Sequence, residues 1–248
     1  MKNILLKKMN NLTAKKTLHH IKQVVVCLIV LLSILTSTSC ATKKKSLNDF
    51  KEAPLLGMVY DYDNRACSDT LIIIDEIEEA RSDINGRFII DNLPQGVHLV
   101  TAKKDGYETL SFEFDFRNRS QILYLRIISF HQLLKKLEDA IVNREWEEAA
   151  SLNERAEAIK KGDPIQLYLK AIYLNDKGNP EDSAQILLKI IKDGYNEPVI
   201  YLTLSDIYQY KLNNPPEAIK YLEEYLKYEN DRETQQRYEM LRETAADD

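Results

Sequence analysis

The side chains that could carry catalysis or bind a metal are few and widely spaced. Beyond residue 39 the chain has two histidines, His98 and His131, and neither has a Cys or His neighbour at the spacing of a zinc site. No Gly-x-Ser-x-Gly sequence is present to hold a nucleophilic serine, and the seven glycines do not cluster into a phosphate-binding loop. We therefore expect no enzymatic activity, no cofactor and no metal centre.

Two acidic stretches are the remaining candidates for chemistry. Asp61, Asp63, Asn64 and Asp69 carry the oxygen ligands that calcium prefers, although the sequence fits no calcium-binding loop. A polar hairpin loop is the preferred interpretation of this stretch, with a calcium site as the alternative. The second stretch, at residues 145–148, has three glutamates where a helix is expected to begin, and carboxylates there favour the helix dipole rather than catalysis.

The balance of charge argues against nucleic acid as a partner. Six of the 34 Lys and Arg residues lie in residues 1–39, a segment without Asp or Glu. The rest of the chain therefore carries 28 basic and 39 acidic side chains, whereas a nucleic-acid-binding surface needs an excess of basic ones. Three cysteines are too few for a disulfide framework, so we expect the fold to be stabilised by its hydrophobic core.

The first 39 residues have the pattern of an export signal. A lysine-rich start precedes an apolar run over residues 24–35, which is shorter than the roughly 20 residues needed to span a bilayer. Small residues at 37–39 then lead directly to Cys40. This order resembles the signal of bacterial lipoproteins, which implies a lipidated Cys40 at the start of the mature chain and a polar tether over residues 40–53. The alternative is an ordinary signal peptide cleaved nearby, with a free Cys40 thiol.

Residues 54–129 alternate apolar and polar side chains with the period of a β-strand. The clearest run places Leu110, Phe112, Phe114 and Phe116 on one face, which we expect to be buried. Turn residues separate six expected strands, at 56–62, 70–75, 87–91, 97–103, 109–116 and 122–127. Short strands at this spacing predict a small antiparallel β sandwich.

The turns of this segment carry a family resemblance. Residues 83–88, 92–96 and 104–107, after an opening strand that includes Gly57, resemble in this order the carboxypeptidase regulatory-like domain. The resemblance implies a prealbumin-like sandwich with a structural or accessory role and no catalytic residues. Three glycines in these turns are suited to a positive φ, namely Gly86, Gly96 and Gly106.

From residue 130 the period changes to that of an α-helix, and similar residues recur 34 positions apart. Small residues, which let two helices cross closely, keep this step as the pairs Ala171 with Ser205 and Ala184 with Ala218. Breakers at 144–145, 178–180 and 213–216 divide the segment into three helix pairs. Residues 231–244, polar over most of their surface, predict a final capping helix.

The third helix pair gives the best match to a known repeat. Its Tyr201, Leu204, Ser205, Tyr208 and Ala218 are similar to the W-x2-L-G-x2-Y … A pattern of the tetratricopeptide repeat (TPR). The first two pairs place Leu137, Ala140, Ala171 and Ala184 in related positions. The resemblance covers residues 130–248 and implies an all-α, TPR-like array that binds proteins or peptides in a groove. An ordinary helical bundle is the alternative, because amphipathic periodicity alone does not exclude it.

The resemblance also implies which side chains line the groove, since the first helix of each repeat faces it. Aligned on the small residues, these positions are His131, Leu134, Glu138, Ile141, Val142, Ile165, Tyr168, Ile172, Asn175, Asp176, Val199, Leu202, Asp206, Gln209 and Tyr210. Nine are apolar or aromatic, three are acidic and none is Lys or Arg. Such a groove should prefer a segment with hydrophobic anchors and some basic residues. The alternative is that the capping helix or the sandwich covers this face, leaving it as core.

These patterns together predict a multidomain, non-catalytic lipoprotein of the bacterial envelope. The expected segments are a signal peptide (1–39), a tether (40–53), a β sandwich (54–129) and three TPR-like repeats with a capping helix (130–248). We expect membrane contact through the lipid anchor, a protein or peptide partner in the envelope and no nucleic acid. The alternatives are a structural subunit of an envelope complex and an accessory protein that binds glycan or peptidoglycan through the β domain.

Overall fold

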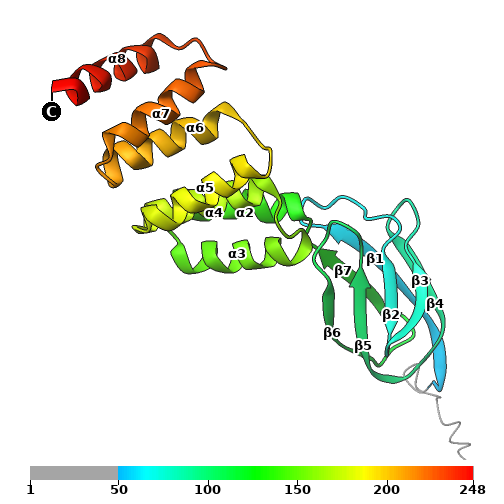
Figure 1. Ribbon diagram of the computed structural model, residues 1–248. Helices are drawn as coiled ribbons and strands as arrows, with labels where there is room; N and C mark the ends of the chain where they lie inside the picture. Colours follow the sequence, from blue (N-terminus) through cyan, green and yellow to red (C-terminus); the bar gives the residue numbers. More distant parts are fainter. Residues whose placement is uncertain (1–49, 248) are drawn as a thin grey trace, which may run out of the picture. The chain divides into compact units, whose positions relative to one another are not determined.

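The computed structural model describes residues 50–247, apart from the side chains of residues 78, 79, 246 and 247. The expected signal peptide, Cys40 and most of the tether lie outside the described residues. Strands come first in the described part and helices follow, and Phe50–Asp248 form one compact unit (Figure 1). None of the helices described combines the length and apolar character needed to cross a bilayer.

Seven strands make up the β module, defined here as residues 50–129. They are β1 (Glu52–Asp61), β2 (Leu71–Ile74), β3 (Ile77–Arg81), β4 (Arg87–Pro94), β5 (Gly96–Lys103), β6 (Leu110–Phe116) and β7 (Ile122–Ile127). They form one sheet in the order β4-β1-β7 and another in the order β3-β2-β5-β6. All pairings are antiparallel except that of β1 with β7, which is parallel. The predicted antiparallel pairing is therefore confirmed for four of these five strand pairs. The β1–β7 pair differs because β7 reaches β1 from β6 in the other sheet rather than through a hairpin.

Both sheets contribute to a single hydrophobic core. Val59 from β1 and Ile72 from β2 are fully buried in the same cluster, together with Val100 from β5. The expected apolar face of β6 is confirmed, but only Phe116 is fully buried, while Leu110, Phe112 and Phe114 pack against the cluster and stay partly exposed. β6 is the edge strand of its sheet. The alternation therefore predicted correctly which side chains face the core, but not how far each of them is buried.

Strand β3 is absent from the sequence-based expectation. It pairs with β2 through a tight turn in which Asp75 (φ 49°) and Glu76 (φ 70°) both adopt the left-handed conformation. Turns of this kind usually carry Gly or Asn, so the pair Asp-Glu gave no hairpin signal. The glycines expected to take positive φ do so, as Gly86 (75°), Gly96 (148°) and Gly106 (74°) show.

Three helix pairs and a final helix make up the helical array, defined here as residues 130–247. They are α2 (Phe130–Val142) with α3 (Trp146–Ile159), α4 (Pro164–Lys177) with α5 (Pro180–Lys192), α6 (Pro198–Asp206) and a π-helix (Ile207–Lys211) with α7 (Pro215–Leu226), and then α8 (Arg232–Asp247). Proline begins four of them, where its missing N–H removes no helical hydrogen bond. The predicted breakers coincide with the turns between paired helices.

The small residues lie where the helices pack. Ala171, Ser205 and Ala218 are completely buried, and the Ser183 hydroxyl on α5 donates a 2.7 Å hydrogen bond to the Ala171 carbonyl on α4. Leu167 and Ala171 of α4 pack in one core cluster with α5, α6 and α7, while Tyr173 of α4 packs in another with α2 and α3. Because α4 belongs to both clusters, the core is continuous along the helical array, as in a repeat array whose neighbouring units share one core.

Candidate partner-binding surface

The first helices of the second and third pairs present apolar side chains to solvent. Ile165 on α4 and Val199 on α6 are 61% and 49% exposed. The Tyr168 hydroxyl on α4 lies 3.1 Å from the Thr203 hydroxyl on α6, and Ile165 and Val199 each lie one turn before these residues. The two exposed aliphatic side chains therefore lie on the same side of neighbouring helices.

The surface of α4, α6 and the π-helix, called the first-helix surface below, contains most of the residues expected to line the groove. Its members are Ile165, Tyr168, Ile172, Asn175, Asp176, Val199, Leu202, Asp206, Gln209 and Tyr210. Ile165, Asp176, Val199 and Tyr210 are exposed, and the others are partly exposed. Apolar side chains thus alternate along this surface with acidic and amide groups.

The first helix pair differs from this pattern. Leu134 and Ile141, which were expected to line the groove, are each only 6% exposed and belong to the core cluster of α2, α3 and α4. That expectation is corrected for these two residues, because packing against α3 and α4 covers the side of α2 that they occupy. His131, Glu138 and Val142 on the same helix are exposed.

The other end of the first-helix surface is contacted by the final helix. Arg237 of α8 donates hydrogen bonds of 2.7 Å to the carboxylate of Asp206 and to the amide oxygen of Gln209. Its guanidinium also lies over the ring of Tyr210, 5.0 Å from the centroid. Asp206 is therefore already paired, whereas Glu138 and Asp176 are exposed. Sequence reasoning missed Arg237, because a single arginine on a polar helix gives no signal of its target.

An insertion shapes the same end of the surface. The third helix pair has one more residue before its second helix than the first pair, and the π-helix Ile207–Lys211 accommodates it with a wider turn. Arg237 contacts Asp206, Gln209 and Tyr210. The last two of these residues lie in the π-helical turn. In the second pair the chain instead ends α4 at Gly178, which has a left-handed φ of 101°.

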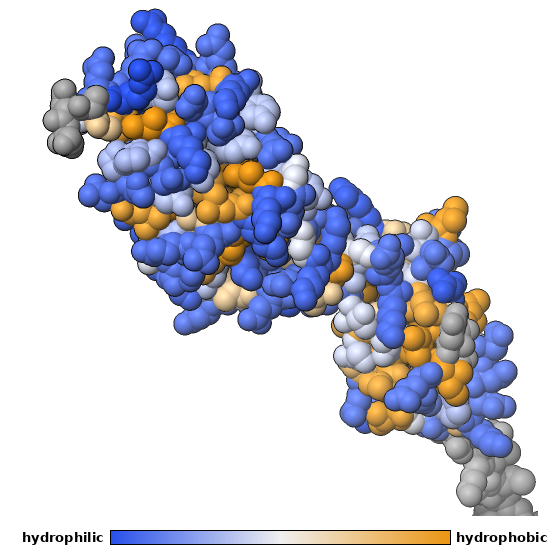
Figure 2. Space-filling model, viewed as in Figure 1, coloured by the Kyte–Doolittle hydropathy of each residue, from blue (hydrophilic) through white to orange (hydrophobic). Residues whose placement is uncertain are grey.

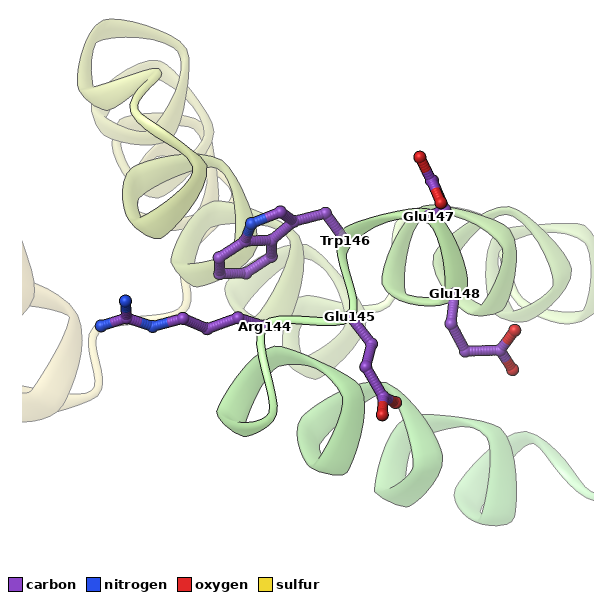
Figure 3. Close-up of a pocket in the computed structure, with 5 residues that line it drawn as sticks. All are labelled: Arg144, Glu145, Trp146, Glu147 and Glu148. Carbon is purple, nitrogen blue, oxygen red and sulfur yellow. The ribbon is translucent and has the colours of Figure 1, made fainter.

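A shallow hollow lies at the turn between α2 and α3, where the acidic helix start was expected. It is lined by Arg144, Glu145, Trp146, Glu147 and Glu148. Figure 3 shows that the arginine and the glutamates point away from one another, so they do not converge on a common point. Trp146 packs toward Tyr173, with ring centroids 6.2 Å apart. Trp146 therefore contributes to the packing of α3 against α4. Glu147 and Glu148 lie in the first turn of α3, where carboxylates favour the helix dipole.

The acidic stretch near the start of the β module forms a hairpin loop. One oxygen of the buried Asp61 carboxylate accepts hydrogen bonds from the backbone N–H groups of Asp63 (2.8 Å) and Arg65 (2.9 Å). Asp69 pairs with Arg81 at 3.0 Å. Across residues 50–247, no three His, Cys, Asp or Glu side chains lie together where they could hold a metal ion. The hydrogen bonds of Asp61 fit the hairpin interpretation rather than the calcium site.

His98, one of the two candidate histidines, is buried in the β module with both ring nitrogens engaged. Nδ1 lies 2.7 Å from an Asp75 carboxylate oxygen and Nε2 lies 2.9 Å from the Pro94 carbonyl oxygen. The hydrogen bond from His98, with one from the Leu99 backbone, holds the pKa of Asp75 below its usual value. These contacts connect the turn before β3 with the start of β5, which is a structural role.

The helical array is similar to several solved structures. These include the Sgt2 TPR domain from Aspergillus fumigatus (16% identity, TM-score 0.42, 47% of this chain and 79% of that one), the TPR domain of Arabidopsis OM64 (15%, 0.41, 46% and 94%) and PcrH from Pseudomonas aeruginosa (12%, 0.40, 47% and 91%). No protein-family model and no curated protein matches the chain. Likenesses this distant carry no argument about the function of this chain.

Proposed function

We propose that the chain is a non-catalytic scaffold that binds a protein or peptide through the first-helix surface. The observation that carries the proposal is the position of Ile165 and Val199, two exposed aliphatic side chains on adjacent helices of a repeat array. Apolar side chains held at a fixed spacing on a rigid array are suited to receive the hydrophobic anchors of a partner.

The partner segment should combine hydrophobic anchors with basic residues. Asp176 and Glu138 are exposed acidic side chains on the first helices, and none of the expected groove positions is Lys or Arg. The contact of Arg237 with Asp206, Gln209 and Tyr210 supports this preference, because it shows a guanidinium bound by side chains of this surface.

The proposal includes a place for the protein in the cell envelope. The support is the sequence of residues 1–40, in which a basic start, a short apolar run and small residues precede Cys40. The two sheets around one core support a sandwich like that of carboxypeptidase regulatory-like domains as the accessory module beside the tether. Intact mass of the membrane form should show acylated Cys40, and Cys40→Ser should release the protein from the membrane. A mature chain that begins elsewhere would remove the lipoprotein part of the proposal.

Glycan binding through the β module is the weaker alternative. Tyr124 is exposed on the outer face of the β4-β1-β7 sheet, but Leu56 and Ile122 beside it are aliphatic. Sugars are usually bound by flat aromatic rings together with hydrogen-bonding groups. The other alternative is a structural subunit of an envelope complex, in which the β module docks and the helical array is only a spacer. The experiment below separates it from binding at the first-helix surface.

Site-specific photo-crosslinking in the full chain tests the scaffold proposal. A photoreactive phenylalanine analogue at Ile165 or Val199 should form adducts with the same partner in cells that express the protein. Tyr195, which is 49% exposed between α5 and α6, provides the matched control position and should form none. Absence of adducts at Ile165 and Val199, or equal adducts at Tyr195, would contradict binding at the first-helix surface.

A further inference from the structure

The outer face of the β4-β1-β7 sheet carries apolar side chains on all three of its strands. Ile89, Leu56 and Ile122 are cross-strand neighbours and are 54%, 51% and 44% exposed. The next row brings Met58 beside Tyr124, which is also exposed. Apolar side chains that continue across three adjacent strands form one surface, and such surfaces on folded domains mark sites of contact.

The two ends of this face carry opposite charges. Arg87 and Arg126 lie toward the end at which β1 finishes, in register with Met58 and Tyr60. Asp91, two positions beyond Ile89 on β4, lies on the other side of the apolar row, and Glu52 lies at the start of β1 on the same side. The four charged side chains are exposed. Along the strands the face therefore changes from acidic through apolar to basic.

We propose that this face binds a second copy of the chain. The two copies would be related by a two-fold axis that lies in the plane of the interface. The axis would run across the strands through the row of Ile89, Leu56 and Ile122, so the strands of the second copy would run in the opposite direction. The apolar row would then pack against itself, and each Arg87 would meet the Asp91 of the other copy. A surface of one charge, such as an anionic bilayer, would be repelled by the acidic end of the face.

The other sheet supplies a matched control. Figure 2 shows apolar side chains over β2 and β5 on the outer face of the β3-β2-β5-β6 sheet. They include Val97 and Leu99, which are exposed like Ile89. Their cross-strand neighbours on β6 are Asp115 and Glu113. Asp115 is paired with Arg117 of the same chain. Two copies that met over Leu99 would still bring their Glu113 carboxylates together, so we expect less self-association there than on the other sheet.

Cysteine cross-linking of the full chain in the cells that express it tests the proposal. Ile89→Cys lies on the expected axis, so a short bis-maleimide should convert this variant to a covalent dimer several-fold more than Val97→Cys. The wild-type chain gives the background from its own cysteines, of which Cys67 is buried. If Ile89→Cys gives no more covalent dimer than Val97→Cys, the proposal is overturned. The face would then be covered by another part of the chain or by a different protein, or by nothing.

Charge reversal separates this dimer from chance collision. In the Ile89→Cys background, Arg87→Asp and Asp91→Arg should each lower the yield of cross-linked dimer, because each brings like charges together. The two reversals combined should restore the yield, since the pairs re-form with exchanged signs. Resistance of the buried Cys67 to maleimide shows that each variant is folded. Failure of the combined variant to recover, while Cys67 stays protected, overturns the proposed geometry. The result does not depend on any partner of the helical array.

Discussion

Small residues in the β module are constrained differently from those in the helical array. A Cβ atom added to Gly57 would lie 2.0 Å from the ring of Phe88, and one added to Gly86 would lie 2.4 Å from the Val59 carbonyl oxygen. In the array, Ala171 and its equivalents are buried between helices at a spacing repeated in each unit. The module thus depends on single close contacts, whereas the array repeats one contact several times. The array therefore combines one packing contact, repeated between helices, with outer surfaces whose side chains differ from unit to unit.

Gly57→Ala should have the largest effect on stability. The added methyl group must displace the buried Phe88 ring. Overpacking of a core costs up to about 3 kcal/mol, and we expect a loss near that upper value. Ala171→Gly in the array removes a methyl group at a helix crossing and should cost about 1 kcal/mol through helix propensity. Urea unfolding of the two variants measures both values. Equal losses would contradict the contrast between the two regions.

The buried amides of the array should show coupled effects. The Gln166 side chain on α4 is fully buried and donates a hydrogen bond to the Asn153 side chain on α3. Gln166→Leu or Asn153→Leu should each cost about 2 kcal/mol, because the remaining amide loses its partner. The double variant should cost less than the sum. Strictly additive losses in a double-mutant cycle would show that the two amides do not stabilise one another.

Asp75→Asn in the β module should have a smaller effect that depends on pH. The hydrogen bond from His98 lowers the pKa of Asp75 in the folded state, so the folded state favours the ionised carboxylate. The stabilisation is present above the unfolded pKa of about 4 and is lost as pH falls through the lower folded pKa. At pH 6 the variant should be less stable than the wild type by at most about 1 kcal/mol, because the Asp75 carboxylate is half exposed and solvent screens its charge. The difference should shrink below pH 4. A difference that is constant between pH 2 and 6 would rule out the linkage.

Arg155→Ala should have the smallest effect and should sharpen the boundary between the two regions. Arg155 on α3 donates two hydrogen bonds of 2.8 Å to the Glu108 carboxylate in the β module, and its guanidinium lowers the pKa of that carboxyl. The pair is partly exposed, so its loss should cost about 0.5–1 kcal/mol. Calorimetry should then separate two melting transitions if residues 54–129 and 130–248 are independent domains. A single transition in this variant would count against that division.

Repeating patterns in the sequence were enough to predict the helix pairs and most of the strands. The helix pairs followed from small residues such as Ala171 and Ser205 at a constant step, because buried helix crossings admit few side chains. Six strands were predicted from the alternation of apolar and polar side chains in the segments between turn residues. The missed strand β3 has a turn at Asp75 and Glu76 that the surrounding sheet imposes without a glycine. The parallel pairing of β7 with β1 is a property of the whole module, which no local pattern contains.

The predicted groove positions are accessible to solvent in the second and third helix pairs, but only some of them are in the first. The repeat spacing placed Ile165 and Val199 on exposed positions of adjacent helices. It also placed Leu134 and Ile141 in the groove, although the packing of α2 against α3 and α4 buries them. The contact of Arg237 with Asp206 joins two helices far apart in sequence, so helix periodicity alone did not indicate it.

The most direct measurement of the central claim is the affinity of the partner identified by crosslinking for two variants of the full chain. The double variant Ile165→Asp and Val199→Asp places charges on exposed positions of the first-helix surface, so we expect at least about a tenfold loss of affinity. Its melting temperature should remain close to that of the wild type, because neither side chain is buried. Tyr195→Asp, the control outside this surface, should bind as the wild type does. Unchanged affinity in the double variant, or an equal loss in Tyr195→Asp, would contradict the account.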